Sequence, residues 1–238
     1  TQNIFRKLSV GLLSAGILSY SLLPSEGMKY LWKRRSRRKS RDLRAAKRLY
    51  LTFDDGPSRE YTGQLLMLLK QYEIKASFFV VEEFARKNPM LIERMKEEGH
   101  LVGLHSVRHE NALFRGRKFV HRDLEQSIAA MEKMGGDPCY YRPPWGHLNL
   151  WTLYYCRQRN LKLTFWDVMA HDWSAKETSE TIKKKLLKRV FPGAVICLHD
   201  GRGKDGAPKR TVEALRGALP ILLKQGYTFE RMDSYEWF

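Results

Sequence analysis

The residues most able to do chemistry begin with two adjacent carboxylates, Asp54 and Asp55, in the stretch LTFDDGPS. Side by side, two like charges repel each other, and the Gly56-Pro57 turn that follows keeps a regular helix or strand from relieving that repulsion. A bound divalent cation would make the pair favourable, because its charge attracts both carboxylates. The stretch therefore points to a metal site, although a DDGP turn on its own is equally typical of a simple loop.

Two histidines four positions apart, His105 and His109 in HSVRH, could supply further metal ligands. This spacing puts two imidazoles on one face of a helical turn, as metal sites require. With one aspartate they would form a set of two histidines and one carboxylate, which leaves positions open for water and substrate. The spacing alone is weak evidence, because a pair of ordinary polar histidines shows it as well.

The elements that must position these residues alternate between short strands and helices. This order predicts a parallel sheet covered by helices, because parallel neighbours need long crossover connections. We expect Pro220 to kink or restart the last helix. Seven strands could close into a barrel or stay open, and periodicity does not decide between the two. The strands are expected at 48–53, 76–81, 100–105, 138–142, 161–166, 194–199 and 227–232, and the helices at 59–72, 88–98, 121–134, 148–159, 178–190 and 208–225.

Ionisable side chains follow five of these seven strands at their carboxyl ends. In barrels and open α/β sheets alike, this edge is where sites are built. The sequence therefore predicts one active site that gathers residues from several strands. Besides the two acids and the two histidines, the candidates are Arg142, Asp167, Asp172 and His199 with Asp200.

Five motifs in this order, TFDDGPS, HSVRH, RPPWG, HDW and LHD, resemble those of the polysaccharide deacetylase family over about residues 49–232. The resemblance implies an α/β fold, a distorted (β/α) barrel of about seven parallel strands. It also implies a metal-dependent hydrolase that removes N-acetyl groups from N-acetylglucosamine residues of a glycan, such as peptidoglycan or a chitin-like oligosaccharide. The cofactor would be one divalent ion, Zn²⁺ in the first place, with Co²⁺, Ni²⁺ or Mn²⁺ as alternatives.

The resemblance implies a role for each matching position. Asp54 would be the general base, and Arg142 would hold it ionised and oriented. His199 would be the general acid that protonates the departing amine. The metal ligands would be Asp55, His105 and His109.

A small pocket for the acetyl methyl group and the oxyanion is implied as well. The backbone N–H of Trp145 would stabilise the oxyanion together with the metal. Trp173 and Leu198 would line the apolar part of the pocket. Pro144 and Asp172, which flank the two tryptophans in the sequence, complete the set.

One position departs from the family's pattern. Family members often carry an aspartate three residues before the aspartate of the DW motif, where it hydrogen-bonds the catalytic histidine, and this chain has Met169 there. A methionine cannot orient an imidazole or raise its pKa as a carboxylate does. Either Asp167 or another group takes this role, or His199 is a weaker acid. The alternative function is therefore a catalytically weak or silent glycan-binding protein of the same fold.

The composition limits the other classes of protein. A length of 238 residues and a hydrophobic content of 43% allow one sizeable domain and exclude wholesale disorder. The three cysteines, Cys139, Cys156 and Cys197, include no C-x-x-C pair, which argues against a disulfide framework and a thiolate zinc site. GRGKDG at 201–206 formally matches a dinucleotide-binding motif, but that fold needs further strand–helix units after it. We expect a basic loop beside the cleft instead.

The beginning of the chain divides into an apolar and a basic segment. Residues 8–25 carry no charge, which predicts a hydrophobic anchor or signal segment over 1–27. Residues 28–48 hold eleven basic side chains and one acid. They therefore carry most of the net charge of the whole chain, which is +17. They predict a polybasic linker before a catalytic domain over 49–238.

The basic segment suggests a membrane partner. It directly abuts the apolar segment, so we expect it to attract anionic lipid headgroups. Nucleic acid is not expected, because no recognition module accompanies the charges. We expect a monomeric, membrane-anchored enzyme on the extracytoplasmic face, although the positive-inside tendency would favour the opposite orientation.

Overall fold

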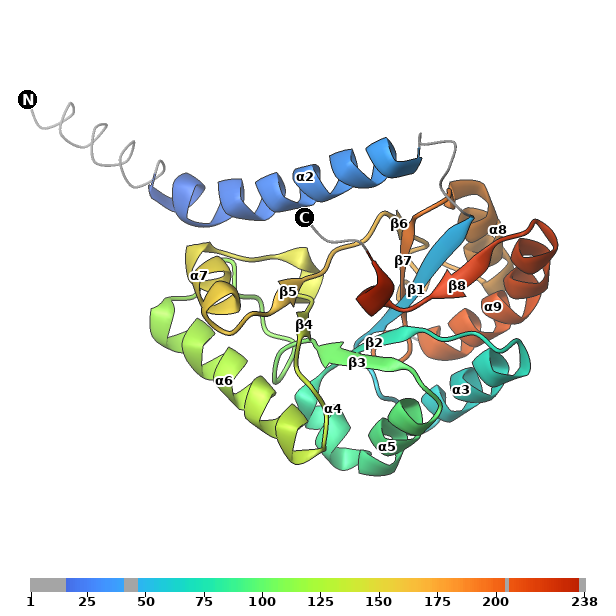
Figure 1. Ribbon diagram of the computed structural model, residues 1–238, viewed down its shortest axis with the longest axis horizontal. Coiled ribbons are helices and arrows are strands. Elements are labelled where there is room, and N and C mark those ends of the chain that lie inside the picture. The colour runs from blue at the N-terminus through green and yellow to red at the C-terminus, as the bar shows by residue number, and fades with distance from the viewer. Residues whose placement is uncertain (1–15, 41–46, 204–205, 236–238) are drawn as a thin grey trace, which may run out of the picture.

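The computed structural model describes residues 16–40, 47–203 and 206–235. In these ranges eight strands, all parallel, form one sheet in the order β5-β4-β3-β2-β1-β7-β6, with β8 paired to the first residues of β1. The sheet curls into a half-barrel that stays open between β5 and β6 (Figure 1). The strands are β1 (Arg48–Asp54), β2 (Ser77–Val80), β3 (Leu101–Leu104), β4 (Tyr140–Tyr141), β5 (Lys162–Leu163), β6 (Val168–Met169), β7 (Val195–His199) and β8 (Thr228–Glu230).

Helices surround the outer face of the curled sheet (Figure 1). Their buried residues pack on the outward side chains of the strands and form the main hydrophobic core, which includes Phe53, Leu69 and Leu198. The helices are α3 (Thr62–Gln71), α4 (Glu82–Lys87), α5 (Pro89–Glu97), α6 (Arg117–Lys133), α7 (Leu150–Gln158), α8 (Ser179–Arg189) and α9 (Ala207–Lys224), with the 3-10 turns η2 (Pro144–Gly146) and η3 (Met232–Ser234).

The predicted α/β fold with parallel strands is confirmed, with three differences in detail. All seven predicted strands are present, and the short strand β6 is an addition that the sequence did not signal. The short helix α4 directly after β2 was also not expected. Pro220 does not restart the last helix, because α9 continues through it as one element.

The register of the central strand begins to build the site. β1 is buried at every position after Arg48, as is typical of a strand covered on both faces. Its last residue, Asp54, pairs with Phe79 of β2 on one side and with His199 of β7 on the other. The carboxyl ends of three parallel strands therefore meet around Asp54.

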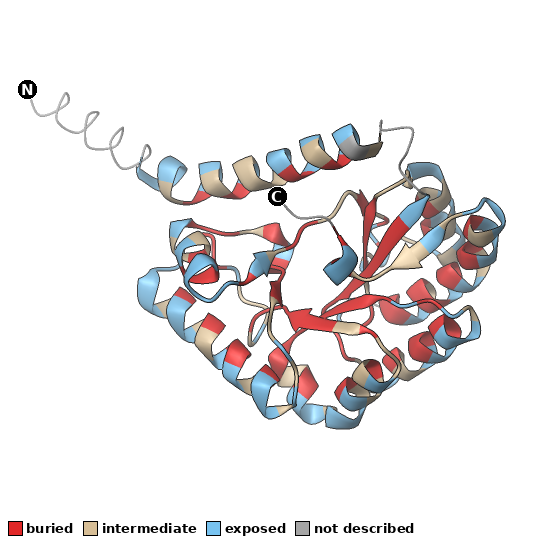
Figure 2. Ribbon diagram, in the orientation of Figure 1, coloured by how far each residue is buried: buried red, intermediate tan, exposed pale blue. Residues whose placement is uncertain are grey.

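A further helix, α2 (Leu23–Ser40), lies across the open side of the half-barrel and continues from the π-helical turn η1 (Leu18–Leu22). Its Trp32 is 3% exposed and stacks on Tyr235, with ring centroids 5.1 Å apart. The same indole meets the edge of Phe165, which lies between β5 and β6, at 5.9 Å. Figure 2 shows that the side of α2 facing the domain is buried and the other side is exposed.

This helix crosses the boundary at residue 27 that separates the predicted anchor from the predicted linker. Its described residues pack on the domain, and the earlier residues 1–15 lie outside the described ranges. The division into an anchor, a linker and a catalytic domain stays a prediction. None of the helices in the described ranges has the length and apolar character that crossing a bilayer demands.

Replacing Trp32 should destabilise the chain strongly. Trp32→Ala removes a buried indole from the cluster inside the half-barrel, and we expect a loss of about 3–5 kcal/mol in the free energy of unfolding. The matched control is Tyr30→Ala, since Tyr30 is 63% exposed on the same helix. Urea unfolding followed by circular dichroism measures both variants. Equal effects of the two substitutions would contradict the packing of α2 on the domain.

Candidate active site

Three predicted metal ligands converge at the carboxyl ends of β1 and β3. The Asp55 Oδ1 atom lies 3.2 Å from the His105 Nε2 atom and 3.0 Å from the His109 Nε2 atom. The exposed fractions of these side chains are 10%, 2% and 8%, so the cluster is largely shielded from water. The structure thus brings one carboxylate and two imidazoles to a common point.

A loop, and not the helical turn expected from the spacing, holds the two histidines. Ser106 and His109 both have left-handed backbone conformations, with φ of 67° and 57°. A helix cannot contain such residues, so the chain turns sharply after β3 and returns the His109 ring toward His105. Asp55 is also left-handed, with φ of 69°, so the chain leaves the extended path of β1 at this residue.

The protonation of His105 makes the cluster fit a cation. Its Nδ1 atom lies 2.6 Å from the backbone oxygen of Arg142. A carbonyl oxygen can only accept, so Nδ1 carries the proton and the lone pair of Nε2 faces the Asp55 carboxylate. Apart from these two imidazole nitrogens, the buried Asp55 Oδ1 has no hydrogen-bond partner within the described part of the chain. The lone pair of His105 Nε2 and the Asp55 carboxylate thus face each other with no proton between them, and a divalent cation could bind both.

The environment of the other imidazole, His109, also favours the neutral form that binds a metal. Burial lowers the pKa of His109 below its usual value and outweighs the opposing effect of the Asp55 carboxylate. A metal ligand must be a neutral imidazole, and a low pKa keeps His109 neutral near pH 7. The site therefore offers three donors of the kind that zinc and similar ions bind.

The second carboxylate, Asp54, is held by a fully buried arginine. Arg142 Nη1 donates to Asp54 Oδ1 at 2.6 Å and to the Thr52 hydroxyl at 2.7 Å. Its Nη2 donates to the backbone oxygen of Phe165 at 3.1 Å. The Cys197 thiol donates to the other carboxylate oxygen, Oδ2, at 3.3 Å. These contacts fix the orientation of Asp54 and compensate its buried charge.

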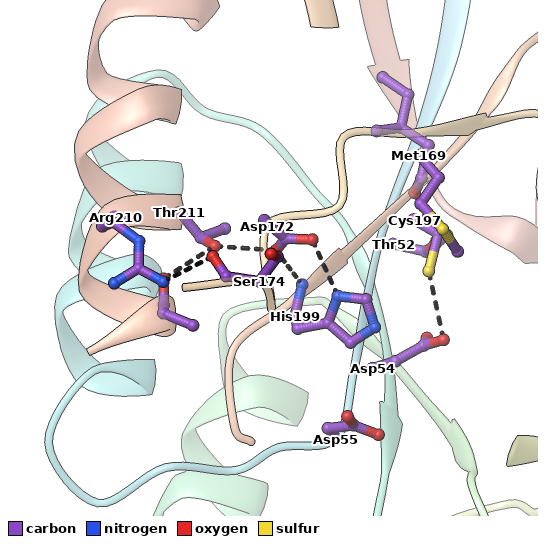
Figure 3. Close-up of polar contacts among 12 residues, drawn as sticks. Thr52, Asp54, Asp55, Met169, Asp172, Ser174, Cys197, His199, Arg210 and Thr211 are labelled. Atoms are coloured by element: carbon purple, nitrogen blue, oxygen red, sulfur yellow. Dashed lines mark hydrogen bonds and ion pairs between the residues drawn. The ribbon is translucent and has the colours of Figure 1, made fainter. Parts of the chain in front are cut away.

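His199 has a carboxylate partner, and it is Asp172. Figure 3 shows the arrangement. The His199 Nδ1 atom lies 2.9 Å from Asp172 Oδ1, and the His199 backbone N–H donates to Asp172 Oδ2 at 2.8 Å. The Thr211 hydroxyl donates to the same oxygen at 2.8 Å. Asp172 is buried completely, so its carboxylate is committed to these contacts.

His199 therefore has a carboxylate partner, although position 169 is a methionine. Asp167, the substitute considered from the sequence, accepts a hydrogen bond from the Val195 backbone N–H at 2.9 Å instead. Burial lowers the pKa of His199, but the charge and hydrogen bond of Asp172, with the charges of Asp55 and Asp54, raise it to about 9. The raised pKa favours the protonated form of His199, which is the form that can donate a proton.

A cavity of about 530 Å³, within the range for ligand sites, joins the two halves of the site. Trp145 lies against His109 with ring centroids 4.2 Å apart, and Trp173 lies 5.1 Å from His199. The lining residues are Asp54, Asp55, His105, His109, Trp145, His147, Trp166, Met169, His171, Trp173, Cys197, His199, Arg202 and Gly203.

Three residues expected in the pocket do not line this cavity. Leu198 belongs to the outer core, because successive residues of a strand face opposite sides and its neighbours Cys197 and His199 face the cavity. Asp172 lies behind His199, and Pro144 is buried beside Trp145. The sequence missed Cys197 and Trp166. Cys197 could have been predicted, because it lies two residues before His199 and every second residue of a strand faces the same side.

Comparisons with known proteins identify the family of this chain. The family model described as polysaccharide deacetylase matches residues 42–165. The peptidoglycan-N-acetylmuramic acid deacetylase PdaA of Bacillus subtilis (strain 168) is 34% identical over 193 residues, which cover 79% of this chain and 70% of the relative. A peptidoglycan-N-acetylglucosamine deacetylase of Bacillus cereus is 34% identical over 181 residues, 75% of this chain and 83% of the relative. The chain belongs to the polysaccharide deacetylase family and is a hydrolase of the deacetylase class.

Solved structures share the fold. The Bc1960 peptidoglycan N-acetylglucosamine deacetylase, in complex with an N-hydroxybenzamide, has a TM-score of 0.75 and 31% identity, and the match covers 80% of this chain and 88% of that one. A CE4 family pseudoenzyme from Bacillus anthracis, BA3943, matches with a TM-score of 0.72 at 21% identity over 80% of this chain and 65% of that one. The fold alone therefore does not distinguish active from inactive proteins. That distinction depends on the side chains of the site.

Removing a predicted ligand should empty the metal site. Asp55→Ala and His105→Ala each delete one of three donors, and we expect both variants to lose bound metal. His147→Ala is the matched control, because His147 lines the same cavity outside the three-ligand cluster. Elemental analysis of the purified variants measures the metal content. Retention of a full equivalent of metal by Asp55→Ala would contradict the assignment.

Proposed function

We propose that this protein removes N-acetyl groups from the amino sugars of peptidoglycan, with N-acetylglucosamine residues as the first candidate. The observation that carries the proposal is the convergence, in one cavity, of the Asp55-His105-His109 cluster with Asp54 on one side and His199 on the other. Relatives named as peptidoglycan deacetylases support the choice of substrate.

The metal cluster would supply the electrophile. A divalent cation held by Asp55, His105 and His109 would polarise the amide carbonyl and make water a stronger acid. We propose Zn²⁺, since one carboxylate and two imidazoles are its common ligands in catalytic sites, and Co²⁺, Ni²⁺ and Mn²⁺ are alternatives.

Two residues would move the protons of the reaction. Asp54 is the general base that takes a proton from the attacking water, and its Arg142 contact keeps the carboxylate pointed into the cavity. Protonated His199 is the general acid. Its Nδ1 is committed to Asp172, so its Nε2–H is the one available for the departing amine nitrogen.

The aromatic walls would select the acetyl group. Trp145 and Trp173 lie on the two halves of the cavity, one against a metal ligand and one against the acid. Apolar faces on both sides favour a small methyl group between them. The backbone N–H of Trp145 remains our candidate for stabilising the oxyanion.

A silent glycan-binding protein is the alternative. Met169 was the feature that favoured it, and the Asp172–His199 contact now accounts for the orientation of the histidine without an aspartate at position 169. We therefore favour an active enzyme. Its action on the extracytoplasmic side follows from the proposed substrate, and a monomeric state stays a prediction.

Acetate release tests the proposed function. We expect the purified chain to release acetate from N-acetylglucosamine oligomers or from peptidoglycan fragments, and the panel identifies the preferred glycan. The Asp54→Asn variant serves as the control for contaminating activity. Binding of these glycans without release of acetate, in protein that holds one equivalent of metal, would favour the silent alternative.

A further inference from the structure

The outward face of α2 has a composition that the catalytic site does not explain. Trp32, Ser25 and Ser36 turn inward and are buried. At helical spacing, the opposite face carries Leu23, Tyr30, Leu31, Arg34, Arg37 and Arg38, all of them exposed. Figure 2 shows this face directed away from the domain along the whole helix.

The apolar and basic residues of this face are separated along the helix. The first part, with the preceding turn η1, exposes large apolar side chains: Ile17, Leu18, Leu22, Leu23, Tyr30 and Leu31. The second part exposes the basic side chains of Lys33, Arg34, Arg37 and Arg38. Several exposed apolar side chains together mark an interaction surface, and the adjoining cations favour an anionic partner.

We propose that the outer face of α2 binds an anionic membrane while its inner face stays packed on the catalytic domain. The apolar half would enter the boundary between headgroups and acyl chains, and the arginines would contact lipid phosphates. A soluble polyanion would account for the arginines but not for Leu23, Tyr30 and Leu31, which is why we favour a lipid surface.

This attachment would place the catalytic cavity beside the membrane. The Ser25 hydroxyl of α2 donates to the backbone oxygen of Gly146 at 3.4 Å. Gly146 stands between Trp145 and His147, which both line the cavity. The bound helix and the wall of the active site are thus in direct contact, and the enzyme would act on glycan close to the bilayer.

Flotation with lipid vesicles tests the proposal on the full chain. We expect a larger fraction of the wild type to float with vesicles of phosphatidylglycerol and phosphatidylcholine than with phosphatidylcholine alone. Replacing Arg34, Arg37 and Arg38 together by Gln should lower partitioning on the order of 100-fold at low salt. Leu31→Asp should lower it by about tenfold or more, since an apolar side chain leaves the interface.

The matched control is Met90→Asp. Met90 is 74% exposed on α5, far from α2 in Figure 1, whereas Leu31 is 49% exposed. Both substitutions add the same charge, so only Leu31→Asp should weaken flotation. If the two variants float equally well, or if the wild type does not bind anionic vesicles, the proposal is wrong. Loss of binding with the arginine variant alone would indicate a polyanion site instead. The assay needs neither glycan nor acetate release, so its outcome is independent of the proposed enzymatic function.

Discussion

Asp54→Asn should retain the metal and lose turnover. The amide keeps the shape of the side chain and a hydrogen bond to Arg142, but it cannot accept a proton from water. Positioned general bases contribute about 10²–10⁴-fold, so we expect a loss in kcat of that size. Acetate release measures kcat, and elemental analysis measures the metal in the same preparation.

The control separates the two neighbouring aspartates. Asp55→Asn weakens a ligand of the metal cluster, so it should lose both the metal and the activity. If Asp54→Asn empties the site and Asp55→Asn does not, the roles of base and ligand are interchanged. Because Asp54 balances the buried charge of Arg142, thermal unfolding of both variants must also be compared.

Asp172→Asn should move the basic limb of the pH–rate profile to lower pH. Against the effect of burial, the charge and hydrogen bond of Asp172, together with the charges of Asp55 and Asp54, raise the pKa of His199 to about 9. The acid must be protonated to act, so activity falls as the pH rises through this pKa. Loss of a nearby opposite charge lowers the pKa of an imidazole by roughly 1–3 units, and the limb should shift by a similar amount.

A second variant grades this effect. Thr211→Val removes one hydrogen bond to Asp172 and leaves its charge, so it should shift the limb in the same direction by less. We would measure kcat as a function of pH for the wild type, Asp172→Asn and Thr211→Val. An unchanged basic limb in Asp172→Asn would mean that His199 is not the titrating acid.

Much of the site was predictable because strand ends collect polar residues. Asp54, Asp55, His105 and His199 each follow or end a short apolar run, and parallel strands bring those ends to one edge. The structure places all four side chains at one cavity. Local pattern and topology were sufficient for this level of detail.

The partner of His199 could not be predicted from the sequence. Asp172 lies 27 residues before His199, in a loop after the two-residue strand β6, which gives almost no periodic signal. The resemblance drew attention to position 169, whereas the loop geometry brings the carboxylate from position 172. The left-handed conformations of Ser106 and His109 could not be predicted either. Neither residue is a glycine, the residue type that usually signals such a conformation.

The packing of α2 was also missed, although its signal is present. Ser25, Trp32 and Ser36 recur on one helical face within a segment dominated by basic residues. The eleven basic side chains of residues 28–48 predict a polybasic linker, and this charge pattern gives no sign that Trp32 is buried. Its burial against Tyr235 depends on the far end of the chain, which a local pattern cannot show.

The central claim is that the Asp55-His105-His109 cluster holds one divalent cation that amide hydrolysis requires. Titration of Zn²⁺ into chelator-treated protein, with acetate release as the readout, tests it most directly. We predict no acetate release before addition, a linear rise, and a plateau at one ion per chain. Full activity of the metal-free protein would contradict the claim.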